Sequence, residues 1–286
     1  MSLKKEIKKT FIPWKNWLRV QAKYYFSQPQ KTTITETTNE VIASITSYPA
    51  RFKSLHLTLK SLVLQKQPAN KILLWIAYED QKALPKNVLQ LAKQGLIEIC
   101  YTEDTRSYKK IIPTLKQYPN ATIVTFDDDV YYPDTVLSSL ISWHLKFPGR
   151  IIANRTHIVM TSDDGQFLPY KQWKKNASNT DCPNQNFQTG IGGVLYPANA
   201  LHHSVLDETL FTKLAPHGDD IWLYWMTRLN GNIVIKTDND FEFYHWPFSQ
   251  KFALYKQNVR QDGNDQQVQA MLEHFGSPLT MPIKNP

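Results

Sequence analysis

Short apolar runs alternate with helical patterns along the first half of the chain. The runs have the length and the β-branched composition of buried strands, and they occupy 41–46, 71–77, 96–101 and 121–126. Between them, apolar residues at helical spacing predict helices over 51–65, 84–94 and 107–118, and Pro113 is expected to kink or delay the last one. Alternating strands and helices predict an α/β fold with a parallel sheet and right-handed crossovers.

The second half continues less regularly. A helix is expected from Pro133 or Asp134 onward, and two more over 219–229 and 264–275. Further strands are expected at 151–154, 157–160, 190–197, 232–236 and 241–244. The stretch 161–189 is polar, aromatic and irregular, which in a compact domain is typical of a functional or disordered loop.

These patterns divide the chain into three parts. Residues 1–40 are expected to be a basic leader and linker, 41–250 a single domain, and 251–286 a helical tail packed on that domain. No internal repeat and no second core is apparent. A length of 286 residues and a hydrophobic content of 42% are sufficient for one large core.

Charge and cysteine content indicate the cellular compartment in which the protein is expected to work. The two cysteines form neither a disulfide framework nor a zinc motif, which favours a reducing compartment. Part of the net charge of +8 lies in residues 1–20, where basic residues are mixed with Phe11, Trp14 and Trp17. That mixture is typical of peripheral contact with an anionic membrane. A loose basic leader, or a helix packed on the domain, are the alternatives. The segment lacks the continuous apolar core of a signal peptide or a membrane span, so we expect a cytoplasmic protein, with or without peripheral contact at the inner membrane.

The strand at 121–126 ends in three consecutive carboxylates, Asp127, Asp128 and Asp129. Charges of this density cannot stay inside a strand, so they are expected at its carboxyl end, where open α/β sheets bind ligands. A divalent cation is a natural way to neutralise them. If strand geometry persists, Asp127 and Asp129 point the same way. A solvated acidic turn is the alternative.

Four motifs occur in order along the chain. They are Thr46-Ser47-Tyr48-Pro49-Ala50-Arg51, the acidic triplet, a glycine-rich strand at 190–193, and His217-Gly218-Asp219-Asp220-Ile221-Trp222. Over roughly 41–250 this set resembles the GT-A glycosyltransferases, especially bacterial family-2-type enzymes that build capsule or lipooligosaccharide. The resemblance implies a Rossmann-like, mostly parallel central sheet flanked by helices, with a small C-terminal acceptor-side extension.

The resemblance also implies a metal and a donor. The acidic triplet corresponds to the DXD motif, with Asp129 and Asp127 as ligands of Mn²⁺ or Mg²⁺, Asp127 alternatively contacting ribose, and His245 as a further ligand. The metal would bridge the diphosphate of a nucleotide-sugar, most simply a UDP-sugar. Asp128 either faces away or acts from the outer shell.

Further donor contacts follow from motif position. The implied donor-binding residues are Thr46, Tyr48, Arg51, Asp104, Lys109, Asp127, Asp128, Gly192 and Gly193. Several of these residues have a simpler alternative role. Tyr48 and Arg51 would then only form and cap a turn, Asp104 would be an ordinary acid in a loop, and either Lys109 or Lys110 would be a solvated surface residue. The glycines would let the backbone approach the donor sugar, or would simply mark a bulged strand.

The acid pair Asp219 and Asp220 resembles the one that supplies the catalytic base in inverting members. By analogy with the second acid of the family's pair, Asp220 is the expected base and Asp219 the second choice. The pair is Asp-Asp here, where Glu-Asp is frequent, which leaves the choice between the two open. Helix capping explains one of these acids equally well. Retaining GT-A enzymes also carry acids here, so inversion is an expectation.

The implied partners are the nucleotide-sugar donor and a glycan or lipid-linked glycan acceptor, with no nucleic acid. Two other functions stay open. A sugar nucleotidyltransferase would share the fold and the metal, but the loop after the first strand lacks the glycine of that class. A non-catalytic protein that binds a nucleotide or nucleic acid is the other, suggested by the basic charge.

Overall fold

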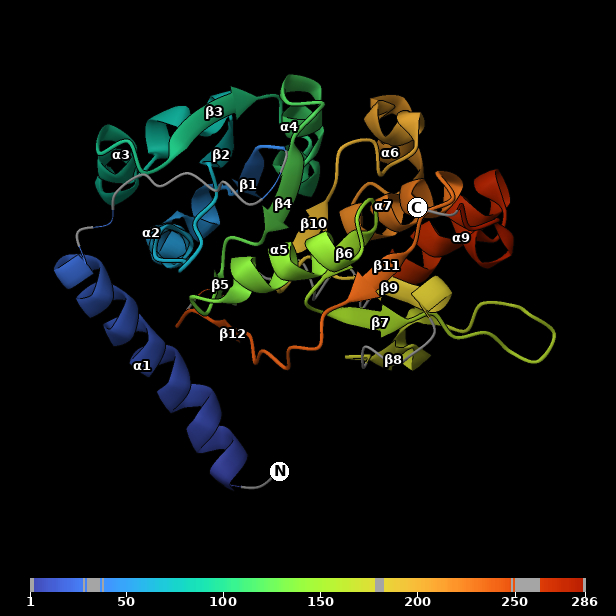
Figure 1. Ribbon diagram of the computed structural model, residues 1–286, viewed down its shortest axis with the longest axis horizontal. Coiled ribbons are helices and arrows are strands. Elements are labelled where there is room, and N and C mark those ends of the chain that lie inside the picture. The colour runs from blue at the N-terminus through green and yellow to red at the C-terminus, as the bar shows by residue number, and fades with distance from the viewer. Residues whose placement is uncertain are drawn as a thin grey trace.

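The computed structural model describes residues 3–27, 29, 37, 39–177, 183–247, 249 and 263–284, with side chains of the first helix described from residue 11 onward. Within this part of the chain a seven-stranded sheet has the order β11-β6-β10-β4-β1-β2-β3. Only β10 runs antiparallel to its neighbours, β4 and β6. The predicted α/β class with a mostly parallel sheet is confirmed (Figure 1).

The strands of this sheet are short, and all are largely buried except the edge strand β3, whose residues are partly exposed. Their bounds are β1 Val41–Thr46, β2 Lys71–Ala77, β3 Glu98–Thr102, β4 Thr122–Phe126, β6 Ile151–Ala153, β10 Val194–Tyr196 and β11 Val234–Lys236. β1 lies between β2 and β4 and pairs with both in parallel, so the carboxyl ends of these three strands meet at one edge.

Alternate side chains of the strands feed two cores, as strand geometry requires. On β6, Ile152 joins one core, whereas Ile151 and Ala153 join the other. The first core is covered by helices α2 Phe52–Val63, α3 Lys86–Lys93 and α5 Val136–Lys146. The second is covered by α4 Ile112–Gln117, α6 Glu208–Leu214, α7 Asp219–Leu229 and α9 Gly263–Phe275.

Two small sheets extend the carboxyl edge. β5 Val130–Tyr131 pairs with β12 Tyr244–His245. β7 Thr156–Ile158 pairs with both β8 Lys174–Lys175 and β9 Asn186–Gln188. Short 3₁₀ turns complete the chain, at Pro49–Arg51, Tyr78–Ala83, Arg106–Lys110, Tyr170–Gln172, Pro183–Gln185, His203–Leu206 and Pro278–Thr280.

Several local predictions need correction. The glycine-rich segment 190–193 is a turn that precedes β10, because Gly192 and Gly193 adopt φ of 108° and 88°, outside strand geometry. The expected strand 241–244 is reduced to β12. Pro113 stands in the first turn of α4, where its missing N–H costs nothing. It starts that helix after a 3₁₀ turn, so the single helix expected over 107–118 is divided.

The first helix, α1 Leu3–Ser27, packs on α2 and β12. Val20 is 3% exposed in a cluster with Leu57 and Trp246, and Trp17 and Tyr24 pack against it. Lys23 adds an ion pair of 2.7 Å with Asp134. Of the three readings of the leader, a helix packed on the domain describes this segment.

At the other end of the chain, α9 packs on α7 and α6. The expected linker falls mostly outside the described residues, as do positions 251–262 of the expected tail and 178–182 of the long loop. In the described part of the chain, no helix combines the length and the apolar character needed to cross a bilayer.

Candidate functional site

A cavity of about 920 Å³ opens at the carboxyl edge of the sheet, where β1 and β4 end. A volume of this order is typical of small-molecule and cofactor sites. Most of the residues that the sequence singled out line it: Thr46, Tyr48, Arg51, Asp104, Lys109, Asp127, Asp128, Asp129, Asp219, Asp220 and His245. Gly190 and Ile191 line it too, whereas Gly192 and Gly193 are not among its lining residues.

The acidic triplet forms a turn between β4 and β5. β4 ends at Phe126, and β5 begins at Val130. The Tyr132 hydroxyl accepts a hydrogen bond of 2.9 Å from the Asp127 N–H. Thr58, fully buried on α2, donates its hydroxyl to the Asp128 carbonyl at 2.8 Å and to the Val130 carbonyl at 3.1 Å. Strand geometry therefore does not persist through the triplet, and the period-2 argument for Asp127 and Asp129 does not apply.

Each carboxylate of the turn has a different partner. Asp127 Oδ1 accepts from Lys110 Nζ at 2.9 Å. Asp128 Oδ2 accepts from the Ser47 hydroxyl at 2.5 Å. Asp129 is paired with the Arg51 guanidinium, and its Oδ2 lies 3.2 Å from His245 Nδ1.

These environments separate the pKa values of two neighbouring acids. Burial, then the charge of Asp129, raises the pKa of Asp128 to about 7. Burial would also raise the pKa of Asp129, but bonding and charge from His245 and Arg51 outweigh it and lower that pKa to about 2. Asp129 is therefore ionised throughout the physiological range, and Asp128 is ionised only in part.

Lys110 joins the acidic turn to the start of α7. Its Nζ lies 2.9 Å from Asp127 Oδ1 and 2.9 Å from Asp219 Oδ2, and its side chain is 7% exposed. Burial would lower the pKa of Lys110, but Asp127 and Asp219 raise it well above its usual value, so the amine stays charged. Sequence reasoning expected one of Lys109 and Lys110 to be a solvated residue, but both are buried, at 2% and 5% exposed, because each pairs with a carboxylate of the cavity.

The acid pair opens α7, where the helix dipole favours negative charge. Gly190 N donates to Asp220 Oδ2 at 3.1 Å. Burial, then the Asp219 charge, raises the pKa of Asp220 to about 7, although Lys110 opposes the shift. A carboxylate that releases its proton near neutrality can act as a general base.

The glycine turn contributes through Gly190. A Cβ on Gly190 would lie 2.9 Å from Asp127 Oδ1 and 3.0 Å from Lys110 Nζ, so a larger residue here would require these two side-chain ends to shift. A Cβ on Gly192 or Gly193 would instead strike Phe243 or Phe126. Gly192 and Gly193 therefore shape the packing behind the cavity.

The remaining residues that were predicted to contact the nucleotide-sugar donor also have partners in or beside the cavity. Asp104 is paired with Lys109 and also accepts from Arg106 N at 3.0 Å. The Arg106 guanidinium lies 2.5 Å from His217 Nδ1. The Thr46 hydroxyl is used within the sheet, where it donates to the Trp75 carbonyl at 2.9 Å. Arg51 Nε donates to the Tyr48 hydroxyl at 3.4 Å.

The side-chain atoms of this site fit a divalent cation that takes the rest of its coordination from a bound ligand. Mg²⁺ binds oxygen donors at about 2.0–2.1 Å in octahedral geometry, so neighbouring ligand atoms are about 3 Å apart. The 3.2 Å between Asp129 Oδ2 and His245 Nδ1 matches that separation. Among the described residues, however, no group of three His, Cys, Asp or Glu side chains is set to hold a metal. Arg51 also contacts Asp129 and would have to share it.

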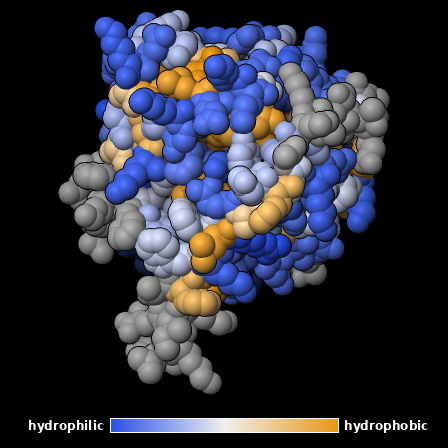
Figure 2. Space-filling model, turned by 90° about the vertical axis from the view of Figure 1, so that its left-hand side faces the viewer, coloured by the Kyte–Doolittle hydropathy of each residue, from blue (hydrophilic) through white to orange (hydrophobic). Residues whose placement is uncertain are grey.

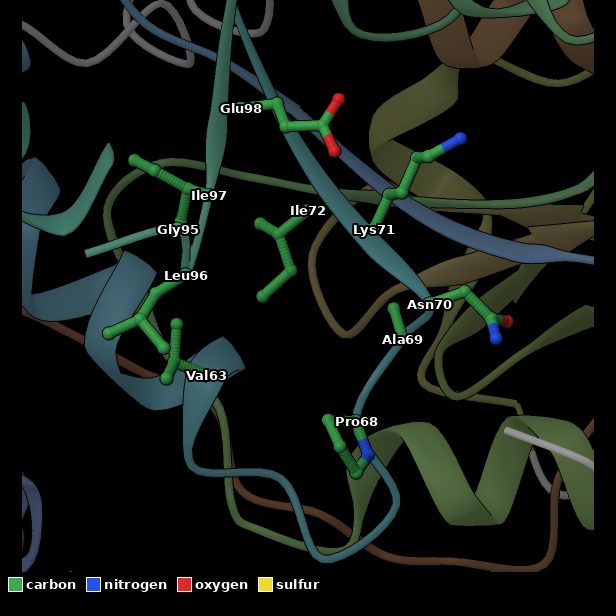
Figure 3. A pocket seen from close by; sticks show the side chains of 10 residues that line it. All are labelled: Val63, Pro68, Ala69, Asn70, Lys71, Ile72, Gly95, Leu96, Ile97 and Glu98. Atoms are coloured by element: carbon green, nitrogen blue, oxygen red, sulfur yellow. The ribbon is translucent and has the colours of Figure 1, made fainter. Parts of the chain in front are cut away.

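A second, much smaller hollow lies at the opposite edge of the sheet. It encloses about 30 Å³ between the start of β2 and the approach to β3, beside Lys71 and Gly95 (Figure 3). That volume is roughly the share of one water molecule. The side chains around it are mostly aliphatic, and we assign it no chemistry.

Comparison with known proteins gives similarity at the level of structure. No family model and no curated protein matches the sequence. A mannosyltransferase from Pyrobaculum calidifontis, solved with GDP-Man and Mn²⁺, is 13% identical over 97% of this chain and 77% of its own, with a TM-score of 0.54. S. aureus TarS 1–349 with UDP is 12% identical, covers 82% of this chain and 65% of its own, and has a TM-score of 0.47.

A synthase is also similar in structure. The 4-diphosphocytidyl-2C-methyl-D-erythritol synthase from Anaerococcus prevotii is 14% identical over 80% of this chain and 96% of its own, with a TM-score of 0.44. At these identities the likeness is one of fold. The chain has a GT-A-like fold. That much of the expected resemblance is confirmed.

The contacts of Lys110 predict a large effect on stability. Lys110→Met should lower the free energy of unfolding by about 3–5 kcal/mol, because it leaves two carboxylates near a buried site without their cation. Denaturant unfolding at pH 8 measures this. Lys116→Met, on the exposed side of α4, is the matched control and should stay within about 0.5 kcal/mol. Equal losses in the two variants would contradict the bridging role.

Proposed function

We propose that this protein is a metal-dependent glycosyltransferase that moves a sugar from a nucleotide-sugar to a glycan acceptor. The observation that carries the proposal is one cavity, at the carboxyl edge of a GT-A-like sheet, in which Lys110 ties an acidic turn to a second acid pair. The neighbours solved with GDP-Man and Mn²⁺ or with UDP support a donor of this class.

The acidic turn would serve the donor diphosphate. Asp129 and His245 would hold Mn²⁺ or Mg²⁺, with Asp127 beside them, and diphosphate oxygens and water would complete the coordination. Such a metal supplies Lewis-acid stabilisation of the departing nucleoside diphosphate. Arg51, whose fork already meets Asp129, would add a second positive charge near the same group.

The acid pair would serve the acceptor. Asp220 would take the proton from the acceptor hydroxyl as that oxygen attacks the anomeric carbon, and Asp219 would stay paired with Lys110 beside it. Tyr48 would stack on the base, and Asp104 and Lys109 would close the donor side of the cavity.

The finer assignments belong to the same proposal. The donor would be a UDP-sugar, and a hexose would be transferred with inversion. The acceptor would be a lipid-linked or growing glycan, and the product would serve capsule or lipooligosaccharide synthesis. Residues 41–250 would be the catalytic domain, with 1–40 as leader and 251–286 as tail.

A panel of nucleotides tests the donor site. We expect one of UDP, GDP, CDP or ADP to raise the melting temperature by roughly 5–10 °C in the presence of Mn²⁺, at about a hundred times its dissociation constant. Mn²⁺ alone should do little, because the protein offers too few ligands. Asp129→Ala should remove the metal-dependent part of the shift, and Asp163→Ala, in an exposed loop, should keep it.

Other outcomes of the panel point to the alternatives. Release of pyrophosphate from a nucleoside triphosphate and a sugar phosphate would identify a sugar nucleotidyltransferase. Absence of any nucleotide shift, with salt-sensitive binding to DNA or RNA, would identify a non-catalytic binding protein. A metal-dependent shift that Asp129→Ala leaves intact would remove Asp129 from the metal site.

The raised pKa of Asp220 predicts a pH profile. A base must be ionised, so kcat/KM should fall about tenfold per pH unit below pH 7 and level off above it. Asp220→Asn should cost about 10²–10⁴ in rate. Asp163→Asn is the exposed control. An acidic limb near pH 4, or a larger loss in Asp219→Asn than in Asp220→Asn, would assign the base to another residue.

We further propose that α1 rests on an anionic membrane surface. Its inner face packs on the domain through Val20, whereas Phe11 and Leu18 on the other side are 66% and 61% exposed. Figure 2 shows apolar side chains along the outward face of this helix. Lys15 and Arg19 lie beside that stripe by helical spacing, and the sequence adds four lysines within residues 4–9, so the charge complements an anionic bilayer.

Sedimentation with phosphatidylglycerol vesicles at low salt tests this surface. The double variant Phe11→Ser with Leu18→Ser should bind at least about tenfold more weakly, because each buried apolar side chain is worth about 1.5–3 kcal/mol. Leu145→Ser, an exposed leucine on α5, is the matched control. Undiminished binding of the double variant would show that this stripe does not contact lipid.

A further inference from the structure

A buried hydroxyl, that of Thr58 on α2, holds the backbone of the acidic turn. Thr58 shares its proton between the carbonyls of Asp128 at 2.8 Å and Val130 at 3.1 Å. The same hydroxyl accepts a hydrogen bond of 2.7 Å from Trp246 Nε1. Thr58 is 0% exposed and Trp246 is 2% exposed, so water cannot readily replace either partner. This hydroxyl therefore joins the turn to the residue that follows β12.

Trp246 also contacts the turn through its own backbone. Its N–H donates to the Asp129 carbonyl at 3.0 Å, which continues the pairing of His245 with Val130 by one more hydrogen bond. Asp129 is thus bonded to Trp246, and His245 directly precedes Trp246 in the chain. The side chains of Asp129 and His245 are the ones that approach to 3.2 Å. A displacement of Trp246 would therefore change the separation of these two side chains.

The first helix helps to bury Trp246. α1 runs past β12 and packs on it (Figure 1). The Trp246 ring belongs to an apolar cluster with Val20 of α1 and Leu57 of α2, and it lies edge to face with the Tyr131 ring at 5.7 Å. The position of Trp246 therefore depends on α1 being docked. Two aromatic residues of α1 also pack against this cluster, Trp17 and Tyr24.

We propose that Trp246 and Thr58 are positioning residues for the metal site, and that α1 takes part by holding the Trp246 ring. Neither Trp246 nor Thr58 lines the cavity, so both act through the backbone that carries Asp129 and His245. The proposal rests on the proposed function, in which those two side chains hold Mn²⁺ or Mg²⁺. Residues that support metal ligands in this way are typically worth about 10- to 100-fold in metal affinity.

A purely structural role would have a different signature. Loss of a buried tryptophan or threonine contact lowers the melting temperature wherever it lies. Only a positioning role lowers nucleotide affinity selectively when the metal is present. The test therefore compares nucleotide binding with Mn²⁺ and with EDTA, by calorimetry well below the melting temperature. The probe is whichever of UDP, GDP, CDP or ADP gives the largest thermal shift.

Thr58→Val keeps the shape of the side chain and removes the hydroxyl. We expect nucleotide affinity to fall about tenfold with Mn²⁺ and to stay unchanged with EDTA. Thr58→Ser, which retains the hydroxyl, should keep the Mn²⁺-dependent affinity of the wild type. Thr227→Val is the matched control, because the Thr227 hydroxyl is equally buried and donates to the Leu223 carbonyl at 2.7 Å within α7.

Val20→Asp tests the contribution of α1. A carboxylate among the apolar side chains of the cluster should release the helix from Trp246 and give the same selective loss. Leu18→Asp is the control on the same helix, because Leu18 is 61% exposed. The measurement uses protein without vesicles, so that membrane contact plays no part.

Amide hydrogen exchange follows the turn without metal or nucleotide. The Trp246 N–H, which is bonded to Asp129, should exchange about tenfold faster in Thr58→Val and in Val20→Asp than in their controls. Faster exchange would show that the hydroxyl and the helix both hold this contact.

Three results overturn the proposal. They are an affinity that Thr58→Val lowers equally with Mn²⁺ and with EDTA or not at all, a loss in Thr227→Val as large as that in Thr58→Val, and an unchanged exchange rate of the Trp246 N–H. An unaltered Mn²⁺-dependent affinity in Val20→Asp would overturn the part assigned to α1. Failure of the proposed function looks different. In that case the wild type itself shows no Mn²⁺-dependent nucleotide binding and the metal site falls with it, while the Trp246 N–H still exchanges faster in Thr58→Val.

Discussion

The buried amine of Lys110 is the contact on which the cavity depends. It meets a carboxylate that follows β4, the central strand of the sheet, and another at the start of α7, a helix that covers the second core. Without a cation between them, these carboxylates would repel each other across a poorly solvated gap. Gly190 leaves room for the contact, because a Cβ there would press on the ends of both side chains. One charge thus fixes the distance between the two acidic groups.

Around this contact, burial and nearby charges give the acids of the cavity different pKa values. Asp128 and Asp220 have their pKa raised to about 7, while Asp129 is held near 2 by Arg51 and His245. Acids whose environments push their pKa values apart are a usual mark of acid–base and metal chemistry in one site. The ribbon of β5 and β12 is what delivers His245 to Asp129, since Val130 and His245 are paired in register.

Side chains of both charges line the same cavity. The acidic turn and the acid pair meet at Lys110, and Arg155 and Lys175 line the cavity beside β7 and β8. The net charge of +8 is therefore unevenly placed, with an acidic centre inside a basic protein.

The sequence by itself determined those features that depend on residues close together in the chain. β1, β2 and α7 have the predicted bounds, because apolar runs and helical spacing act over a few residues. The position of the acidic triplet after a buried strand followed from the same local rule. Most predicted site residues were found in one cavity because strand ends in a parallel sheet share an edge.

Only the tertiary structure decided the rest. Lys110 became the bridging residue because α7, distant in sequence, places Asp219 against it. The 190–193 segment turned where a strand was expected, since its glycines take left-handed conformations next to Phe126 and Phe243. Of the small sheet β8-β7-β9, only β7 overlaps a predicted strand, at 157–160. β8 and β9 lie in the stretch expected to be irregular, because strands of two or three residues carry no periodic signal and are fixed by their partners across the sheet. Local pattern set the elements, and long-range packing set which charges face one another.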